Sequence, residues 1–130
     1  MEVRAKKALG QHFLTDLSIA QKIADALETE ESTVAPTLEI GPGMGVLSQY
    51  LLERKDIDLK MVEIDTESVN YLLTHFPKAN GRLLEADFLK LPLEKFFSGQ
   101  FCVIGNFPYN ISSQIFFKIL EYRQQIPQVV

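Results

Sequence analysis

A glycine-rich turn after an apolar segment near residue 40 strongly constrains what this chain can fold into. The run is Leu38-Glu39-Ile40-Gly41-Pro42-Gly43-Met44-Gly45. The residues before it predict a buried strand over 37–40, and the apolar periodicity after it predicts a helix. Three glycines at alternate positions allow positive φ angles and a close approach of the backbone to a ligand. A strand, a glycine turn and a helix in this order are typical of a cradle for a nucleotide-type cofactor.

Strand and helix patterns alternate along the rest of the chain. Further strands are predicted over 59–64, 82–85 and 101–105, and Val129-Val130 resembles the opening of another. Helices are predicted over 16–28, from the glycine turn to about 55, over 66–76 and from 112 or 113 to 122, each with one apolar face. Thr66 is expected to cap the third of these helices. The inner face of the fourth is expected to carry Ile115, Phe116, Ile119 and Leu120. This alternation predicts an α/β fold, a Rossmann-like doubly wound parallel sheet with helices on both faces.

Composition excludes several classes of protein. The chain has 130 residues, of which 46% are hydrophobic and 23% charged, as in an ordinary globular domain. No apolar run approaches the ~18 residues of a membrane span. The single cysteine, Cys102, cannot form an internal disulfide, and its apolar neighbours predict a buried, inert thiol. A net charge of −4 argues mildly against a nucleic-acid binder, although Arg4, Lys6 and Lys7 form a basic cluster.

Signals for other chemistries are weak. His12 and His75 lie far apart in the sequence and Cys102 lies in a predicted strand, so no metal site is expected. The chain has no Gly-x-Ser-x-Gly nucleophile elbow. Its glycine turn also lacks the Lys-Ser/Thr of a phosphate-binding P-loop.

Polar residues follow the predicted strands at the edge where ligands of open parallel sheets bind. Glu63, at the end of the second strand, could accept hydrogen bonds from both ribose hydroxyls of a cofactor. The alternative is an acid that simply faces solvent. Asp87 follows the third strand and could accept a hydrogen bond from an adenine amino group, with Phe88 beside the ring.

The loop after the fourth strand, Asn106-Phe107-Pro108-Tyr109, is hard to explain by structure alone. Pro108 fixes its own φ and restricts the residue before it, which suits a loop that holds hydrogen-bonding groups at set positions. Asn106 offers an acceptor and Tyr109 a flat ring. Together they could grip a planar amine, whereas the alternative is a turn with an incidental aromatic residue.

Five motifs occur together in one order: Leu9-Gly10-Gln11-His12-Phe13-Leu14, the glycine run 38–45, Val62-Glu63-Ile64-Asp65, Glu85-Ala86-Asp87-Phe88-Leu89, and the run 105–112 that begins Gly105-Asn106-Phe107-Pro108. With them the chain resembles the KsgA-type ribosomal RNA adenine N6-dimethyltransferases, a family of class I S-adenosylmethionine-dependent methyltransferases. The resemblance covers nearly the whole chain.

The resemblance implies roles for residues at matching positions. Gln11, His12 and Leu14 would close over the methionine end of S-adenosylmethionine, although many relatives have Asn where His12 stands. The other cofactor-binding residues would be Gly41, Gly43, Glu63 for the ribose, Asp87 with Phe88 for the adenine, and Asn106. Asn106, Pro108 and Tyr109 would present the target adenine and form the catalytic loop. No metal is implied.

The resemblance also implies an activity and a cellular setting. The enzyme would methylate N6 of adjacent adenosines near the 3′ end of small-subunit ribosomal RNA, in pre-ribosomal particles in the cytoplasm, during ribosome maturation. Three alternatives stay open: a macrolide-resistance type methyltransferase of large-subunit ribosomal RNA, a NAD-dependent oxidoreductase, and a ribosome-assembly module without turnover. The glycine turn lacks the Gly-x-Gly-x-x-Gly spacing that the oxidoreductase would favour.

The family pattern continues beyond residue 130 with further strands, another base-stacking aromatic residue and a C-terminal helical domain. We therefore expect residues 1–15 to form an arm over the cofactor site and residues 16–130 to form an incomplete Rossmann-like catalytic domain. Alone, these residues would have little activity. A sheet edge left open by truncation would invite pairing with a second copy.

Overall fold

The computed structural model describes residues 17–30, 33–106 and 109–130, with only the backbone of 109 and 110. Within these residues, parallel strands form one sheet in the order β3-β2-β1-β4. Their bounds are β1 Ala35–Ile40, β2 Ile57–Glu63, β3 Leu83–Glu85 and β4 Cys102–Gly105. This sheet confirms the predicted α/β class.

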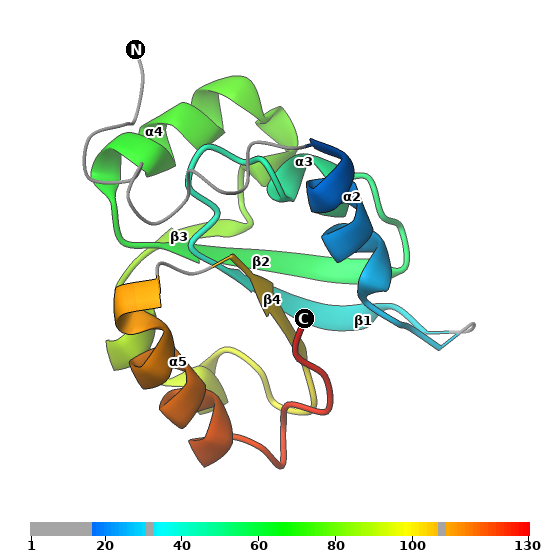
Figure 1. Ribbon diagram of the computed structural model, residues 1–130, viewed down its shortest axis with the longest axis vertical. Coiled ribbons are helices and arrows are strands. Elements are labelled where there is room, and N and C mark those ends of the chain that lie inside the picture. The colour runs from blue at the N-terminus through cyan, green and yellow to red at the C-terminus, as the bar shows by residue number, and fades with distance from the viewer. Residues whose placement is uncertain (1–16, 31–32, 107–108) are drawn as a thin grey trace.

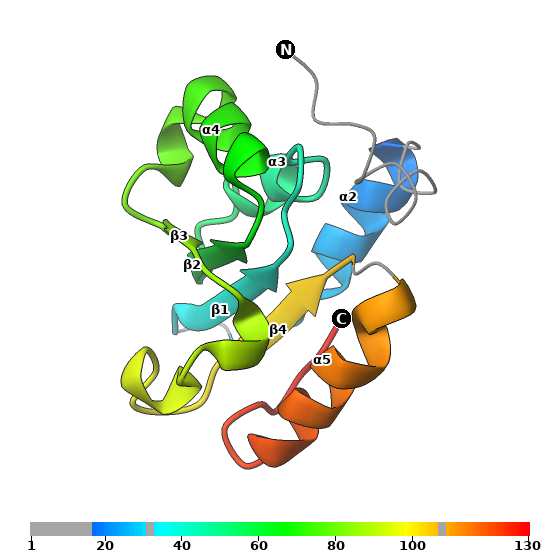
Figure 2. The ribbon, with the colours of Figure 1, turned by 90° about the vertical axis from the view of Figure 1, so that its left-hand side faces the viewer.

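Helices cover both faces of the sheet (Figures 1 and 2). One face carries α2 (Leu17–Ala26), α3 (Ser48–Leu51) and α4 (Thr66–His75), and the other carries α5 (Tyr109–Glu121). Three short 3₁₀ turns complete the connections: η1 (Pro77–Ala79), η2 (Phe88–Lys90) and η3 (Leu93–Lys95). None of the helices in the described part of the chain is long and apolar enough to cross a bilayer.

Strand alternation divides the apolar side chains into two cores. Successive side chains of a strand point to opposite faces, so Leu59 and Met61 of β2 face one core and Val62 faces the other. The first core joins the sheet to α2 and α3 through Ala20, Ala24, Leu27, Leu47 and Leu51. The second joins it to α5 and the 3₁₀ turns through Phe88, Leu91, Leu93, Ile115 and Ile119. A strand that is buried on both faces needs apolar side chains on both, which explains the near-continuous apolar runs in the strand sequences.

The strand register brings the predicted site residues to one edge. Ile40 lies opposite Val62 of β2 and Gly105 of β4, and Glu63 lies opposite Glu85 of β3. Because all four strands are parallel, the residues that follow them meet at their shared carboxyl edge. The glycine turn, Glu63, the segment at Asp87 and Asn106 all belong to this edge.

The first two helices after the glycine turn differ from the sequence prediction. The predicted helix to about residue 55 is only α3, because hydrogen bonds such as Arg54 N–H to Leu51 O follow the tighter i−3 pattern of turns. The cap of α4 is Asp65, not Thr66. Its carboxylate accepts the Ser68 N–H at 3.0 Å, while the Thr66 hydroxyl donates to Glu85.

The predicted inner face of α5 was partly wrong. The helix begins at Tyr109, earlier than predicted, and Ile115 and Ile119 are buried as expected. Phe116, however, is 56% exposed and Leu120 is 41% exposed. The buried position between the two isoleucines is Lys118.

The segment after α5 returns alongside β4 (Figure 1). Val129 pairs with Val103 in a parallel bridge, and the Val130 N–H donates to Val103 O at 2.9 Å. These bonds are those of a further parallel strand beside β4, in line with the predicted strand opening. The pairing of this edge with a second copy stays a prediction.

Candidate cofactor-binding site

The three glycines of the turn all have positive φ, but they serve different purposes. The angles are +66° at Gly41, +59° at Gly43 and +83° at Gly45. A Cβ atom on Gly45 would lie 2.5 Å from Cε2 of Phe76, so this glycine lets the turn pack closely against the end of α4. A Cβ atom on Gly41 would meet no described atom within 4 Å. Among the described residues, nothing therefore fills the space on this side of Gly41, where a ligand could approach the backbone.

Glu63 ties the glycine turn to the end of β2. One carboxylate oxygen accepts the Gly43 N–H and the other accepts the Asp65 N–H, both at 2.9 Å. The side chain is 2% exposed, so the alternative of an acid that faces solvent is wrong. Bonds from two backbone N–H groups fix the orientation of the carboxylate at the carboxyl edge of the sheet, where a ribose-binding acid is required.

A second buried acid, Glu39, lies beside this arrangement. It is 1% exposed on β1 and accepts a hydrogen bond from the Ser48 hydroxyl at 2.6 Å. Burial, opposed by the Ser48 bond and assisted by the negative charge of Glu63, raises the pKa of Glu39 to about 8. Sequence reasoning missed this residue, although an acid inside an apolar strand signals a buried polar contact.

Asp87 follows β3 at the same edge and is partly exposed. Its carboxylate accepts the Leu89 N–H at 3.0 Å and so caps η2. The Phe88 ring is buried in the second core, with Nζ of Lys118 4.9 Å from its centroid. The structure thus places Asp87 where a ligand can reach it and places the Phe88 ring in the core; the role of Phe88 beside adenine stays a prediction.

Several predicted site residues fall outside the described part of the chain. Gln11, His12 and Leu14 belong to the undescribed residues before 17, and Pro108 lies in the undescribed pair 107–108. Asn106 is half-buried directly after β4, and the backbone of Tyr109 opens α5. Their roles toward the methionine end and the target base stay predictions.

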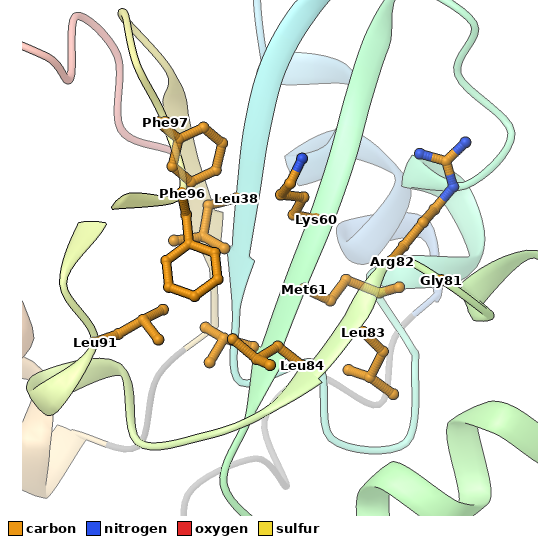
Figure 3. Close-up of a pocket in the computed structure, with 11 residues that line it drawn as sticks. Leu38, Lys60, Met61, Gly81, Arg82, Leu83, Leu84, Leu91, Phe96 and Phe97 are labelled. Carbon is orange, nitrogen blue, oxygen red and sulfur yellow. The ribbon is translucent and has the colours of Figure 1, made fainter. Parts of the chain in front are cut away.

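An apolar pocket lies away from the carboxyl edge (Figure 3). It measures about 200 Å³ and is bordered by β2, β3 and the segment after η3. Phe96 and Phe97 lie on one side of it and Arg82 on the other, with Lys60 between them. None of the predicted site residues lines it. The described residues also contain no cluster of three His, Cys, Asp or Glu side chains that could hold a metal.

A parallel sheet with a glycine turn after its first strand and an anchored acid after its second defines the class: a Rossmann-like α/β protein of the kind that holds nucleotide-type cofactors. The particular family follows from comparison with known proteins. The family model for ribosomal RNA adenine dimethylase matches residues 2–130. The chain therefore belongs to the ribosomal RNA adenine dimethylase family, which confirms the resemblance stated from its motifs.

Curated relatives are named as methyltransferases of ribosomal RNA. The chain is 66% identical over 125 residues to ribosomal RNA small subunit methyltransferase A of Parabacteroides distasonis. This match covers 96% of the present chain and 46% of that protein. It is 60% identical over 129 residues to the protein of that name from Porphyromonas gingivalis, which covers 98% of this chain and 49% of that one. The chain thus spans about half the length of these relatives.

Solved structures support the fold. The structure of S-adenosylmethionine-bound CalS10, an amino pentose methyltransferase from Micromonospora echinaspora, superposes with a TM-score of 0.54 at 17% identity. The match covers 81% of this chain and 42% of that one. It shows a shared Rossmann-like fold.

Proposed function

We propose that the protein containing this chain transfers methyl groups from S-adenosylmethionine to N6 of adenosines in ribosomal RNA. The match of residues 2–130 to the dimethylase family is the observation that supports it most strongly. The relatives named for the small subunit favour that RNA over the large-subunit alternative. The finer proposal is two adjacent adenosines near the 3′ end of small-subunit RNA, in cytoplasmic pre-ribosomal particles.

The residues at the carboxyl edge fit the cofactor. No described atom fills the space beside Gly41, where a ligand would approach the glycine turn, and the two backbone bonds of Glu63 support its role toward the ribose hydroxyls. Asp87 would accept from the adenine amino group, and Gln11, His12 and Leu14 of the proposed arm would cover the methionine end. S-adenosylmethionine, when bound, supplies an electrophilic methyl group on a sulfonium.

The catalytic loop would act mainly by positioning. The exocyclic nitrogen of adenine is a poor nucleophile because its lone pair is delocalised into the ring. The Asn106 side chain and the Pro108 carbonyl would accept its two N–H bonds and direct the lone pair toward the cofactor side of the loop. Tyr109 would stack on the flipped base, which contributes about 1–3 kcal/mol in comparable single-strand contacts.

The test uses protein expressed from the whole gene. Calorimetry should show binding of S-adenosylhomocysteine but not of NAD, which separates a methyltransferase from the oxidoreductase alternative. Asn106→Ala should abolish methylation of purified small subunits and leave S-adenosylhomocysteine binding largely intact. Asn80→Ala, at an exposed position after η1, is the matched control and should keep full activity. Wild-type methylation by Asn106→Ala would show that its assigned role is wrong.

A further inference from the structure

Lys118 is a buried cation that sequence reasoning did not assign to the site. It lies on α5, is 7% exposed, and its Nζ donates to the backbone carbonyls of Phe88 and Leu91, the latter at 2.5 Å. The ammonium also lies over the face of the Phe88 ring, with 4.9 Å between Nζ and the ring centroid. Among the described residues, it forms no ion pair with a carboxylate.

The two carbonyls belong to Phe88, the first residue of the turn η2, and to Leu91, the residue after it; the turn starts directly after Asp87. The Leu91 N–H closes this turn on Phe88 O at 3.1 Å, and the Lys90 N–H bonds Asp87 O at 3.0 Å. The Asp87 carboxylate caps the same turn through the Leu89 N–H. The position of the Asp87 side chain therefore depends on the geometry of a turn that Lys118 grips at both ends.

The electrostatics explain why a lysine tolerates this position. Burial lowers the pKa of Lys118, and the negative charges of Asp87, Glu121 and Glu94 oppose that shift. Charge-assisted bonds to carbonyl oxygens are about twice as strong as neutral ones, so a buried ammonium can hold a short turn firmly. A hydrophobic residue would fill the same volume without binding either carbonyl.

We propose that Lys118 is a positioning residue of the cofactor site, which holds the turn after β3 so that Asp87 recognises the amino group of adenine. Lys118 also lies on the helix that opens at Tyr109, so it connects adenine recognition to the helix that begins at the proposed target-base loop. The inference rests on the proposed function, because it assumes that Asp87 meets the adenine of S-adenosylmethionine.

The experiment compares two ligands that differ at one group. S-adenosylhomocysteine carries the adenine amino group, and S-inosylhomocysteine carries a carbonyl in its place. Calorimetry on whole-gene protein should show that the wild type prefers the adenine ligand. Lys118→Met should weaken binding of that ligand about tenfold and lose most of the preference, with little change for the inosine ligand. Lys90→Met, which removes an exposed lysine of the same turn, should behave as wild type.

The possible outcomes separate the proposals. Equal weakening for both ligands in Lys118→Met, or a preserved preference, overturns the positioning role. If Asp87→Asn keeps the full preference, the assignment of Asp87 to adenine fails and the role of Lys118 fails with it. If the wild type binds neither ligand, the proposed function itself fails. Near-ultraviolet circular dichroism checks folding; if Lys118→Met does not fold, Lys118→Gln, too short to reach both carbonyls, carries the same comparison.

Discussion

The carboxylate of Glu63 accepts the backbone N–H of Gly43 at 2.9 Å, which joins the acid at the end of β2 to the glycine turn at the end of β1. Its other oxygen accepts the backbone N–H of Asp65, and Asp65 is the residue that caps α4. One side chain thus connects the turn, the strand and the following helix. An acid proposed to bind the cofactor also holds the shape of the cradle around it.

Glu63→Gln tests this double role. The amide that replaces the carboxylate would turn its NH₂ toward one of the two backbone donors, so one N–H loses its acceptor in a buried place. We expect unfolding free energy to fall by about 1–3 kcal/mol. We also expect affinity for S-adenosylhomocysteine to fall at least about tenfold, or roughly 1.4 kcal/mol. Urea unfolding and calorimetry measure the two effects, with exposed Glu67→Gln as control. Unchanged values for both would contradict the role of Glu63.

Gly41→Ala tests whether the ligand binds next to the backbone of the glycine turn. Alanine is strained at a φ of +66°, by about 1–2 kcal/mol, but meets no described atom. Gly81→Ala is a matched control, because Gly81 has a φ of +82° and equally open surroundings away from the carboxyl edge. Both variants should lose similar stability in urea, and only Gly41→Ala should lose cofactor affinity. Equal losses of cofactor affinity in the two variants would mean that backbone strain, and not a contact between ligand and Gly41, lowers the affinity.

The sequence predicted the edge where the site forms better than the contacts that support it. The positions of Glu63 and Asp87 could be predicted because the residues that end parallel strands all lie at the carboxyl edge of the sheet. The bonds from Gly43 and Asp65 could not, because they depend on how two loops meet in space. The burial of Glu39 could not be predicted, because the local sequence of its strand gives no information about a hydrogen bond from Ser48 on the facing helix.

Lys118 illustrates a different limit. The predicted inner face of α5 used Ile115, Phe116, Ile119 and Leu120, yet positions 115, 118, 119 and 122 also follow helical spacing. A lysine is not expected on a buried face, because charged residues are seldom buried. The carbonyls of Phe88 and Leu91 that make its burial possible lie about thirty residues away in the chain and carry no local signal.

Arg54→Met should destabilise the fold without affecting the site. The guanidinium of Arg54 donates to Ala24 O and Leu27 O, at 2.8 and 2.9 Å, and so binds the carboxyl-terminal end of α2. Loss of these charged hydrogen bonds should lower the unfolding free energy by about 1.5–3 kcal/mol. Arg54 precedes β2, at the sheet edge opposite the site, so S-adenosylhomocysteine affinity should stay unchanged. Exposed Lys55→Met is the control, and an equal loss of stability there would contradict the role of Arg54.

Arg54 should also make stability depend on acid pH. Its hydrogen bond holds the pKa of Asp56 below the usual range, with help from the Thr29 hydroxyl and against the opposing effect of partial burial. A carboxyl with a lowered pKa stabilises the fold above its unfolded pKa of about 3.8 and loses that contribution as the pH falls further. The stability difference between wild type and Arg54→Met, measured by urea unfolding, should therefore narrow below about pH 4.

Glu39 should make stability depend on pH in the opposite direction. Its pKa is raised from 4.5 to about 8. Between these pH values the folded protein therefore keeps a proton on Glu39 that the unfolded chain has already released. The folded state is then favoured most below pH 4.5, and this contribution is lost as pH rises toward 8. The neutral acid also avoids a second negative charge beside Glu63.

Glu39→Gln removes the titration and keeps an oxygen that can accept the Ser48 hydroxyl. The variant can be less stable overall, because its amide N–H bonds need acceptors in a buried place. Its unfolding free energy relative to wild type should nevertheless rise by at least about 1.4 kcal/mol between pH 4.5 and 8, the equivalent of one pKa unit. Urea unfolding across this range measures the difference, with Glu67→Gln as the exposed control. A difference independent of pH would show that Glu39 ionises normally in the folded protein.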